Sequence, residues 1–136
     1  MAVRILPNVE GILIAFLKDD PDVSPLLAGR VYSTIPTAKV YPLARVARFA
    51  GAPVFQVPAE LDAAQVQLDV WADSKQAAWQ AIATMRAAMA ERLPGVHALG
   101  KVAGVDLGQL SYDPDETFDP AKPRYIADVT VYARPA

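Results

Sequence analysis

The residues of this sequence that could carry out catalysis or bind metals form no recognisable catalytic constellation. His97 is the only histidine and cysteine is absent, which excludes disulfides, thiolate metal sites and cysteine nucleophiles. A catalytic histidine needs a partner that orients its ring, and none can be identified for His97. The serines lack a nucleophile-elbow context, and the glycines after Leu93 form neither a GxGxxG element nor a P-loop. We therefore expect no catalytic, cofactor or metal site.

The densest group of potential metal ligands is an acidic segment near the C-terminus. It contains Asp113, Asp115, Glu116 and Asp119, with prolines at positions 114 and 120. The segment lacks the glycine at the sixth position and the glutamate at the twelfth that an EF-hand calcium loop requires, which disfavours a metal site. Two other interpretations stay open: a solvated hairpin tip, or a loop that contacts another protein.

Basic residues gather in the predicted first pair of strands, among them Arg45 and Arg48. They form either an ordinary solvated strand face or a surface complementary to an acidic partner. A contact between copies of the chain would explain the basic and the acidic group together. We therefore expect Arg45 or Arg48 of one copy to face the acidic segment of the next. Exposed apolar residues beside these strands, with Phe55 as the candidate contact, also favour an interaction protein.

Composition limits the classes of protein that this chain can belong to. Its 136 residues, 53% hydrophobic and 21% charged, predict one globular domain over residues 1–136. A formal charge of −2 lacks the basic excess of nucleic-acid binders. The N-terminus is too poor in apolar residues for a signal peptide, and no apolar run reaches the length of a membrane span. We expect no membrane partner, and the lack of cysteine fits a reducing cytosol.

A strand followed directly by the longest helix organises the predicted fold. Residues 65–71 alternate between apolar and polar side chains, which is typical of a strand with one covered face. Asp73 is the expected N-cap of the following helix, and Pro94-Gly95 the expected end. The helix carries one apolar stripe: Ala78, Ile82, Met85, Met89 and Leu93. Trp71 and Trp79 are expected in or near the core, and the alternative for them is burial against another copy of the protein.

The preceding segment predicts a second helix and two strands. Asn8 should cap a helix over Val9–Lys18, which Asp19-Asp20-Pro21 ends; these carboxylates should make that end fray. One helical turn follows, with Ser24 as its cap. Strands are predicted over 30–35 and 40–49, with Arg45 and Arg48 on opposite faces of the second. Residues 50–63 read as a connection.

The C-terminal segment predicts a hairpin. After a loop that contains His97, a strand over 102–112 should bulge or curve at Gly104 and Gly108. The last strand spans Arg124–Arg134. The predicted order is α-β-β-β-α-β-β, an α+β fold with an antiparallel or mixed sheet and its helices on one face.

Taken end to end, the chain resembles the tail-completion or tail-terminator family of long-tailed, siphovirus-like bacteriophages. The order and spacing of several short segments carry the resemblance, and no one of them is diagnostic. They are the amphipathic helix at Val9–Lys18, Ser24-Pro25-Leu26-Leu27, Gly29-Arg30-Val31-Tyr32, Tyr41-Pro42-Leu43-Ala44-Arg45-Val46, Val66-Gln67-Leu68-Asp69-Val70-Trp71-Ala72-Asp73 with the helix that follows, and the last strand from Arg124.

The resemblance implies a structural virion protein of the tail or neck, assembled in the host cytoplasm, with no enzymatic activity and no cofactor. It implies a homohexameric ring that caps the tail tube, ends tube polymerisation and joins the head. The partners would be other copies of the chain, the tail tube protein, and a head-completion or connector protein. Alternatives are another neck component, a gene transfer agent or tail-like bacteriocin, and a cytosolic α+β ligand-binding domain or enzyme.

Overall fold

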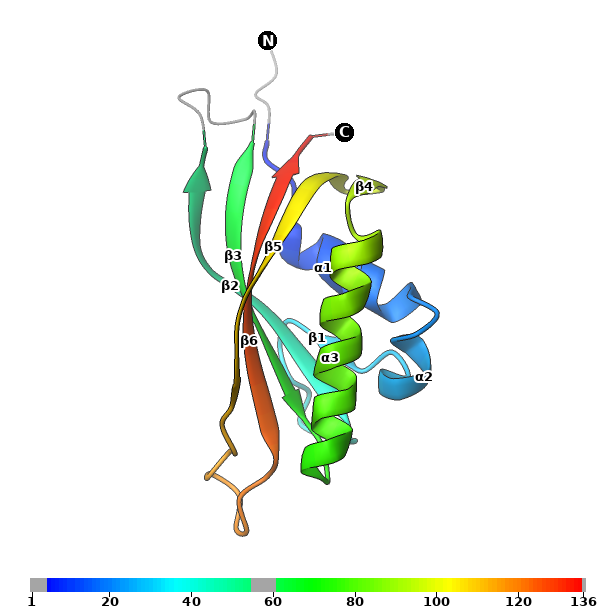
Figure 1. Ribbon diagram of the computed structural model, residues 1–136, viewed down its shortest axis with the longest axis vertical. Coiled ribbons are helices and arrows are strands. Elements are labelled where there is room, and N and C mark those ends of the chain that lie inside the picture. Colours follow the sequence, from blue (N-terminus) through cyan, green and yellow to red (C-terminus); the bar gives the residue numbers. More distant parts are fainter. Residues whose placement is uncertain (1–4, 55–60, 136) are drawn as a thin grey trace.

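A curled, mixed, six-stranded sheet forms one layer of the protein, and three helices lie on one of its faces (Figure 1). The computed structural model describes residues 5–54 and 61–135. The strand order is β1-β2-β3-β6-β5-β4, with only β1 and β2 parallel. The elements are α1 (Val9–Asp19), α2 (Ser24–Leu27), β1 (Val31–Tyr32), β2 (Leu43–Pro53), β3 (Asp62–Trp71), α3 (Lys75–Arg92), β4 (Gly95–His97), β5 (Gly100–Tyr112) and β6 (Arg124–Arg134).

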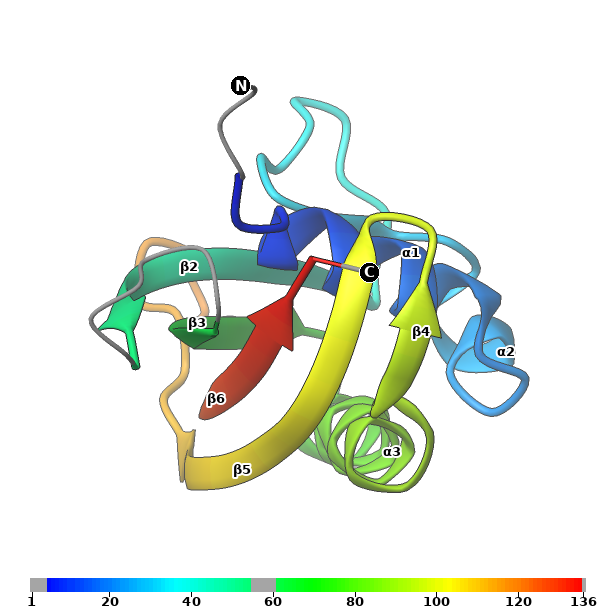
Figure 2. The same cartoon turned by 90° about the horizontal axis from the view of Figure 1, so that it is seen from above.

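The core lies between the helices and the inner face of the sheet, as the apolar periodicity predicts (Figure 2). Val66, Leu68 and Val70 of β3 are buried there, together with the whole predicted stripe of α3. The fold class and the placement of helices on one face are confirmed. Trp79 does not lie in the core as expected, because 47% of it is exposed and its ring only borders Tyr125, with 5.6 Å between centroids.

The ends of the helices confirm some predictions and correct others. Asn8 caps α1 and accepts from the N–H of Gly11, as predicted. Ser74 rather than Asp73 caps α3, because its hydroxyl accepts from the N–H of Ala77. Residue 23 precedes α2 as its N-cap without a side-chain bond, so the prediction of Ser24 in that role is wrong.

β2 and β3 are longer than the strands predicted there, whereas β1 is shorter. β2 continues to Pro53 and β3 begins at Asp62, so residues 50–53 and 62–63 of the predicted connection belong to paired strands that project from the sheet. β1 holds two residues only, and His97 lies in the short strand β4 rather than in a loop. Register shifts beside Gly104 and Gly108 confirm the predicted irregularities of β5.

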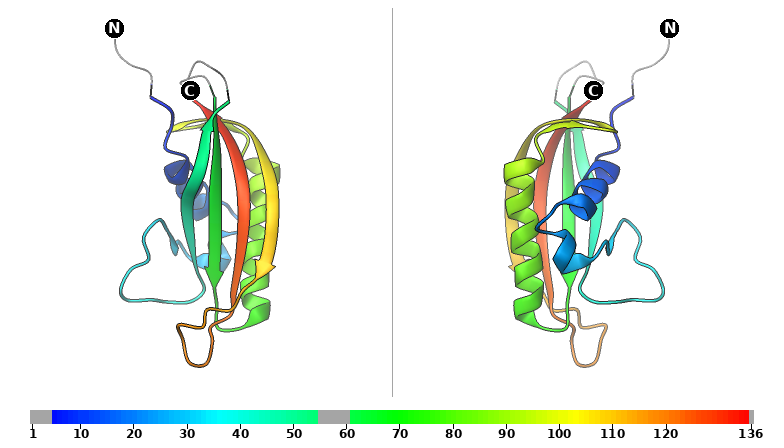
Figure 3. Two further views of the ribbon diagram at one scale, coloured as in Figure 1. Left: turned by 90° about the vertical axis from the view of Figure 1, so that its left-hand side faces the viewer. Right: turned by 90° about the vertical axis from the view of Figure 1, so that its right-hand side faces the viewer.

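The molecule is elongated along its strands (Figure 3). The β2–β3 hairpin and the described ends of the chain lie at one end of the sheet, and the β5–β6 connection lies at the other. This connection, residues 113–123, is called the acidic tip below. The segment between β1 and β2 projects sideways from the β2 side of the molecule.

Candidate functional site

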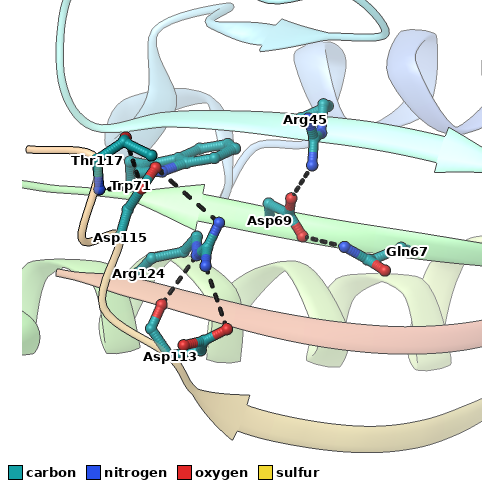
Figure 4. A network of polar contacts seen from close by, with 8 residues as sticks. All are labelled: Arg45, Gln67, Asp69, Trp71, Asp113, Asp115, Thr117 and Arg124. Carbon is teal, nitrogen blue, oxygen red and sulfur yellow. Dashed lines mark hydrogen bonds and ion pairs between the residues drawn. The ribbon is translucent and has the colours of Figure 1, made fainter. Parts of the chain in front are cut away.

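The face of the sheet opposite the helices carries the largest set of polar contacts. No helix of the described chain covers this outer face, and the acidic tip folds back over one end of it (Figure 4). Strand alternation places the odd-numbered side chains of β3 on this face. The network comprises Arg45, Gln67, Asp69, Trp71, Asp113, Asp115, Thr117 and Arg124.

Trp71 joins the acidic tip to the sheet. Its indole Nε1–H donates to Oδ2 of Asp115 over 2.8 Å, and its side chain is buried although it lies on the outer face. The guanidinium carbons of Arg45 and Arg124 lie 5.4 and 5.8 Å from the ring centroid, within range of cation–π attraction. The predicted burial of Trp71 is therefore confirmed, and the tip itself contributes to that burial.

Asp115 organises the tip around its carboxylate. Burial opposes its ionisation, but hydrogen bonds from Thr117 and Trp71 and the charge of Arg124 outweigh that effect, so the pKa of Asp115 lies below its ordinary value. The backbone N–H and hydroxyl of Thr117 donate to Oδ1 at 3.1 and 2.7 Å. Asp115 also pairs through its backbone with Lys122. The tip is thus an ordered turn.

The remaining acidic residues of the tip divide into two kinds. Asp113 pairs with Arg124 inside the chain, with 3.1 Å between Oδ2 and Nη2. Glu116 and Asp119 are exposed and make no ion pair within the described residues. The tip therefore presents two carboxylates to the outside.

The two arginines of β2 occupy opposite faces of the sheet, as their spacing predicts. Arg45 forms an ion pair with Asp69 on the outer face, and Asp69 also accepts from Gln67 at 2.9 Å. Arg48 forms an ion pair with Asp62 at the other end of β3. Both carboxylates are buried and both guanidinium groups stay about one-third exposed. These internal pairs hold the arginines in place beside the edge of the sheet.

A small hollow lies between the acidic tip and the segment before β2. Its volume is about 200 Å³, and its lining is mostly apolar: Ile35, Tyr41, Leu43, Trp71 and Phe118, with Lys39, Asp115 and Thr117. Lys122 lies next to this hollow. Its Nζ is 3.7 Å from the ring centroid of Tyr41 and 2.7 Å from Oδ1 of Asp73. These groups hold the tip in place, and they do not converge on a reacting atom.

A second ion-pair cluster joins α1 to α3. Both oxygens of Asp20 accept from Arg92, at 2.8 and 2.9 Å, and Asp22 accepts from the same guanidinium at 2.8 Å. The hydrogen bonds from Arg92 hold the pKa of Asp20 below its ordinary value, although burial acts in the opposite direction. The predicted fraying at this end of α1 is therefore wrong, because Asp20 is buried and paired.

His97 has a packing role in this structure. Its Nε2–H donates to the carbonyl oxygen of Leu93 over 2.6 Å, and its ring packs edge-on against Phe16 at 6.2 Å. No acid, cysteine or second histidine groups with it in a metal-binding set among residues 5–54 and 61–135. The same residues include no helix that is long and apolar enough to cross a membrane.

Of the predicted contact residues, the structure places Arg45 and Arg48 on β2 and the four acidic residues on the tip. No ion pair joins the two groups within the described residues, although Arg45 and Asp115 both contact Trp71. Phe55 lies outside the described residues. Sequence reasoning missed the buried acids Asp20, Asp62 and Asp69 as partners. Asp62 and Asp69 stand alone within apolar or strand-like segments, and that is the signal that could have drawn attention to them; Asp20 lies in the acidic run Asp19-Asp20-Pro21-Asp22 and gives no such signal.

Comparisons with known proteins add the family. A family model described as "Tail completion protein gp17" matches residues 12–134. A search of curated proteins gives no match. Among solved structures, the fold is similar to a chain of "Virion of native gene transfer agent (GTA) particle", with a TM-score of 0.69 and 14% identity over 92% of this chain and 93% of that chain. The chain belongs to the tail completion protein gp17 family and is a structural component of a phage-like tail or neck in the virion.

Proposed function

We propose that this protein caps the tail tube as a homohexameric ring, ends tube polymerisation and presents the surface to which the head side attaches. The observation that carries the proposal is the match to the tail completion family over nearly the whole chain. The similarity in fold to a gene transfer agent virion chain supports a tail-like particle in general.

The shape of the subunit suits a ring with two different faces. A ring needs one heterologous contact repeated around an axis, and each face of the ring must match a different partner. Here the two hairpin ends lie at opposite ends of the strands (Figure 3). If the strands run along the ring axis, the β2–β3 hairpin and the acidic tip meet different partners, the tube on one side and the neck on the other.

The contact between copies is proposed to involve the residues that the sequence singles out. β2, with Arg45 and Arg48, lies on one side of the four long strands, and β5, which leads into the acidic tip, lies on the other. A repeated head-to-tail contact therefore brings the arginine strand of one copy toward the acidic segment of the next. Each guanidinium is about one-third exposed, so a neighbour can share it with the internal carboxylate.

The proposal is tested by mass and by capping. Light scattering of the purified protein over a range of concentration and salt should give a mass of about six copies. Added to polymerising tail tube protein, the ring should shorten the tubes in electron micrographs and appear at one tube end only. Tubes of unchanged length, with no protein at their ends, would contradict the capping role.

The same measurements separate the alternatives. Binding to purified connector or portal, without binding to the tube, would favour another neck component. A protein that stays monomeric alone and in the presence of tubes would favour the ligand-binding alternative. Assembly with components of a gene transfer agent or tail-like bacteriocin would identify the type of particle.

A further inference from the structure

We infer that the ring closes by strand pairing, with the edge of β2 in one copy joined antiparallel to the edge of β5 in the next. This inference rests on the proposed ring and specifies its contact. It concerns two windows of backbone, residues 49–53 of β2 and residues 103–107 of β5, which are called the β2 window and the β5 window below.

Both windows lack a strand partner on their outer side within the described chain. β1 pairs only with Ala44 and Arg45 of β2, which precede the β2 window in the strand. β4 pairs only with Gly100, Lys101 and Val102 of β5, next to the β5 window. Every residue of the β2 window is exposed, as are Ala103, Asp106 and Leu107 of the β5 window. An exposed strand edge is a template for pairing with another chain.

The two windows lie at the same height along the strands. Strand registers connect Ala50 to Gln65, Gln65 to Thr130, and Thr130 to Asp106. The same registers place Gly51 level with Val105 and Ala52 level with Gly104. Cyclic symmetry rotates a copy without moving it along the axis. Windows at equal height therefore meet when the strands run along that axis.

The strand directions also fit. β2, β3, β6 and β5 are successively antiparallel, so β2 and β5 run in opposite directions at the two sides of this four-stranded unit. Because this unit has an even number of strands that alternate in direction, repeating it side by side keeps every neighbouring pair of strands antiparallel. Joining β2 of one copy to β5 of the next thus continues an antiparallel sheet through the ring.

Two charged side chains mark the ends of the windows. Glu10 accepts from the backbone N–H of Arg48 at 3.1 Å, just before the β2 window. Arg86 donates to the backbone carbonyl of Gly108 at 2.9 Å, just after the β5 window. By register Arg48 is level with Leu107, the neighbour of Gly108. On both edges, the backbone hydrogen bonds to these side chains therefore lie at nearly the same position along the strands, and each window has one boundary there.

The side chains of the windows are suited to close approach. The β2 window contains Ala50, Gly51 and Ala52, and the β5 window contains small or β-branched residues from Ala103 to Val105. Neither window contains lysine, which often protects a free edge. Pro53 at the end of the β2 window has no N–H to donate, so the pairing uses the N–H groups of residues 49–52. The carboxylate of Asp106 accepts from the Tyr132 hydroxyl over 2.9 Å, which draws it onto the outer face of its own sheet.

Two large apolar side chains lie at the matching ends of the windows. Phe49 is 56% exposed, and Leu107 is 39% exposed. Leu107 is level with Arg48, the residue next to Phe49. Pairing of the windows would place Phe49 of one copy beside Leu107 of the next and remove both from water, which favours association.

Disulfide trapping tests the inference, because the chain has no cysteine. Ala50 and Asp106 both belong to the outer face, and three strand spacings, about 14 Å, separate them within one copy. A disulfide requires Cα atoms within about 7 Å, so a bond can form only between copies. The variant Ala50→Cys with Asp106→Cys should give a covalent ladder ending at the ring size under mild oxidation.

Three controls make the trapping decisive. Each single variant should stay uncrosslinked, because a head-to-tail contact never brings a residue to its own counterpart. Ala50→Cys with Val96→Cys should give no ladder, since Val96 is 75% exposed but lies on β4. Dimers from a single variant would indicate two-fold edge pairing and overturn the inference, as would a ladder equally strong with Val96→Cys.

The failures of the two proposals are distinguishable. A ring of the expected mass that gives no ladder overturns the edge pairing and leaves the ring. A wild-type protein that is monomeric alone and with tubes overturns both. As a second measurement, Phe49→Asp and Leu107→Asp should each weaken assembly on the order of ten-fold or more. Val96→Asp should leave assembly unchanged, and equal assembly by all three folded variants would contradict the inference.

Discussion

The buried carboxylates show how single residues hold this fold. Asp20, Asp62 and Asp69 are each buried, and each faces one arginine that is partly open to solvent. Burial of an unpaired carboxylate costs far more than the net gain from a paired one. Removal of one partner of such a pair should therefore lower the free energy of unfolding more than the partial exposure of the arginine suggests.

Asp20→Asn should lower the free energy of unfolding by about 1–3 kcal/mol at neutral pH, because it removes the charge that Arg92 faces. Since the pKa of Asp20 is lowered in the folded state, its contribution is fully present above about pH 5 and is lost as pH falls through the folded pKa. The difference between wild type and variant should therefore narrow in acid. Urea unfolding at several pH values measures it.

Asp22→Asn is the matched control for this pair. Asp22 contacts the same guanidinium but is exposed, so its loss should cost about 0–1 kcal/mol. An equal loss from both variants, or a difference that does not change with pH, would contradict the role given to Asp20.

At the scale of elements, the β2–β3 hairpin extends beyond the part of the sheet that the helices cover (Figure 1). Its exposed backbone contains Gly51 at φ 120°, opposite Ala64 of β3. A Cβ added there would lie 2.2 Å from the carbonyl oxygen of Ala63. The hairpin thus depends on a glycine for its conformation and for the close approach of β3.

Gly51→Ala should destabilise the protein by about 1–3 kcal/mol, because strain in φ adds to a clash with backbone. Thermal unfolding followed by circular dichroism measures the change. Gly29→Ala is the control: its φ is also positive, at 77°, but nothing lies within 4 Å of the added Cβ. An effect of Gly51→Ala no larger than that of Gly29→Ala would show that β3 can move away.

At the scale of the whole molecule, charge is distributed unevenly in spite of a net charge of only −2. The tip presents Glu116 and Asp119 outward, while Arg45 and Arg48 belong to β2, which is separated from β5 by two strands. Reversal of Arg48 to Glu should weaken the ring, but it would also leave Asp62 buried beside a like charge. The tip therefore offers the cleaner test of attraction between copies.

Glu116→Lys with Asp119→Lys should weaken ring formation on the order of ten-fold at low salt, and less at 0.5 M salt because ions screen exposed charges. Stability of the subunit should be unchanged, since neither residue pairs within the described chain. Glu91→Lys, an exposed reversal on α3, serves as the control for net charge. Equal ring formation by all variants, measured by light scattering, would exclude the acidic tip from the contact.

The sequence by itself determined the parts of the fold that depend on near neighbours. The alternation in β3, the stripe of α3, the Asn8 cap and the irregularities at Gly104 and Gly108 follow from periodicity and backbone geometry within a few residues. The family resemblance rested on the order of these same elements, and residues 12–134 match the family.

Only the tertiary structure decided which distant residues meet. Asp20 meets Arg92 across 72 positions, and Trp71 meets Asp115 across 44. Such pairs depend on how helices cross and how strands align, which no local pattern encodes. The equal height of the two open windows has the same origin, because it is the sum of three strand registers. Local sequence thus predicts the elements, and their mutual placement decides where a surface for another copy can form.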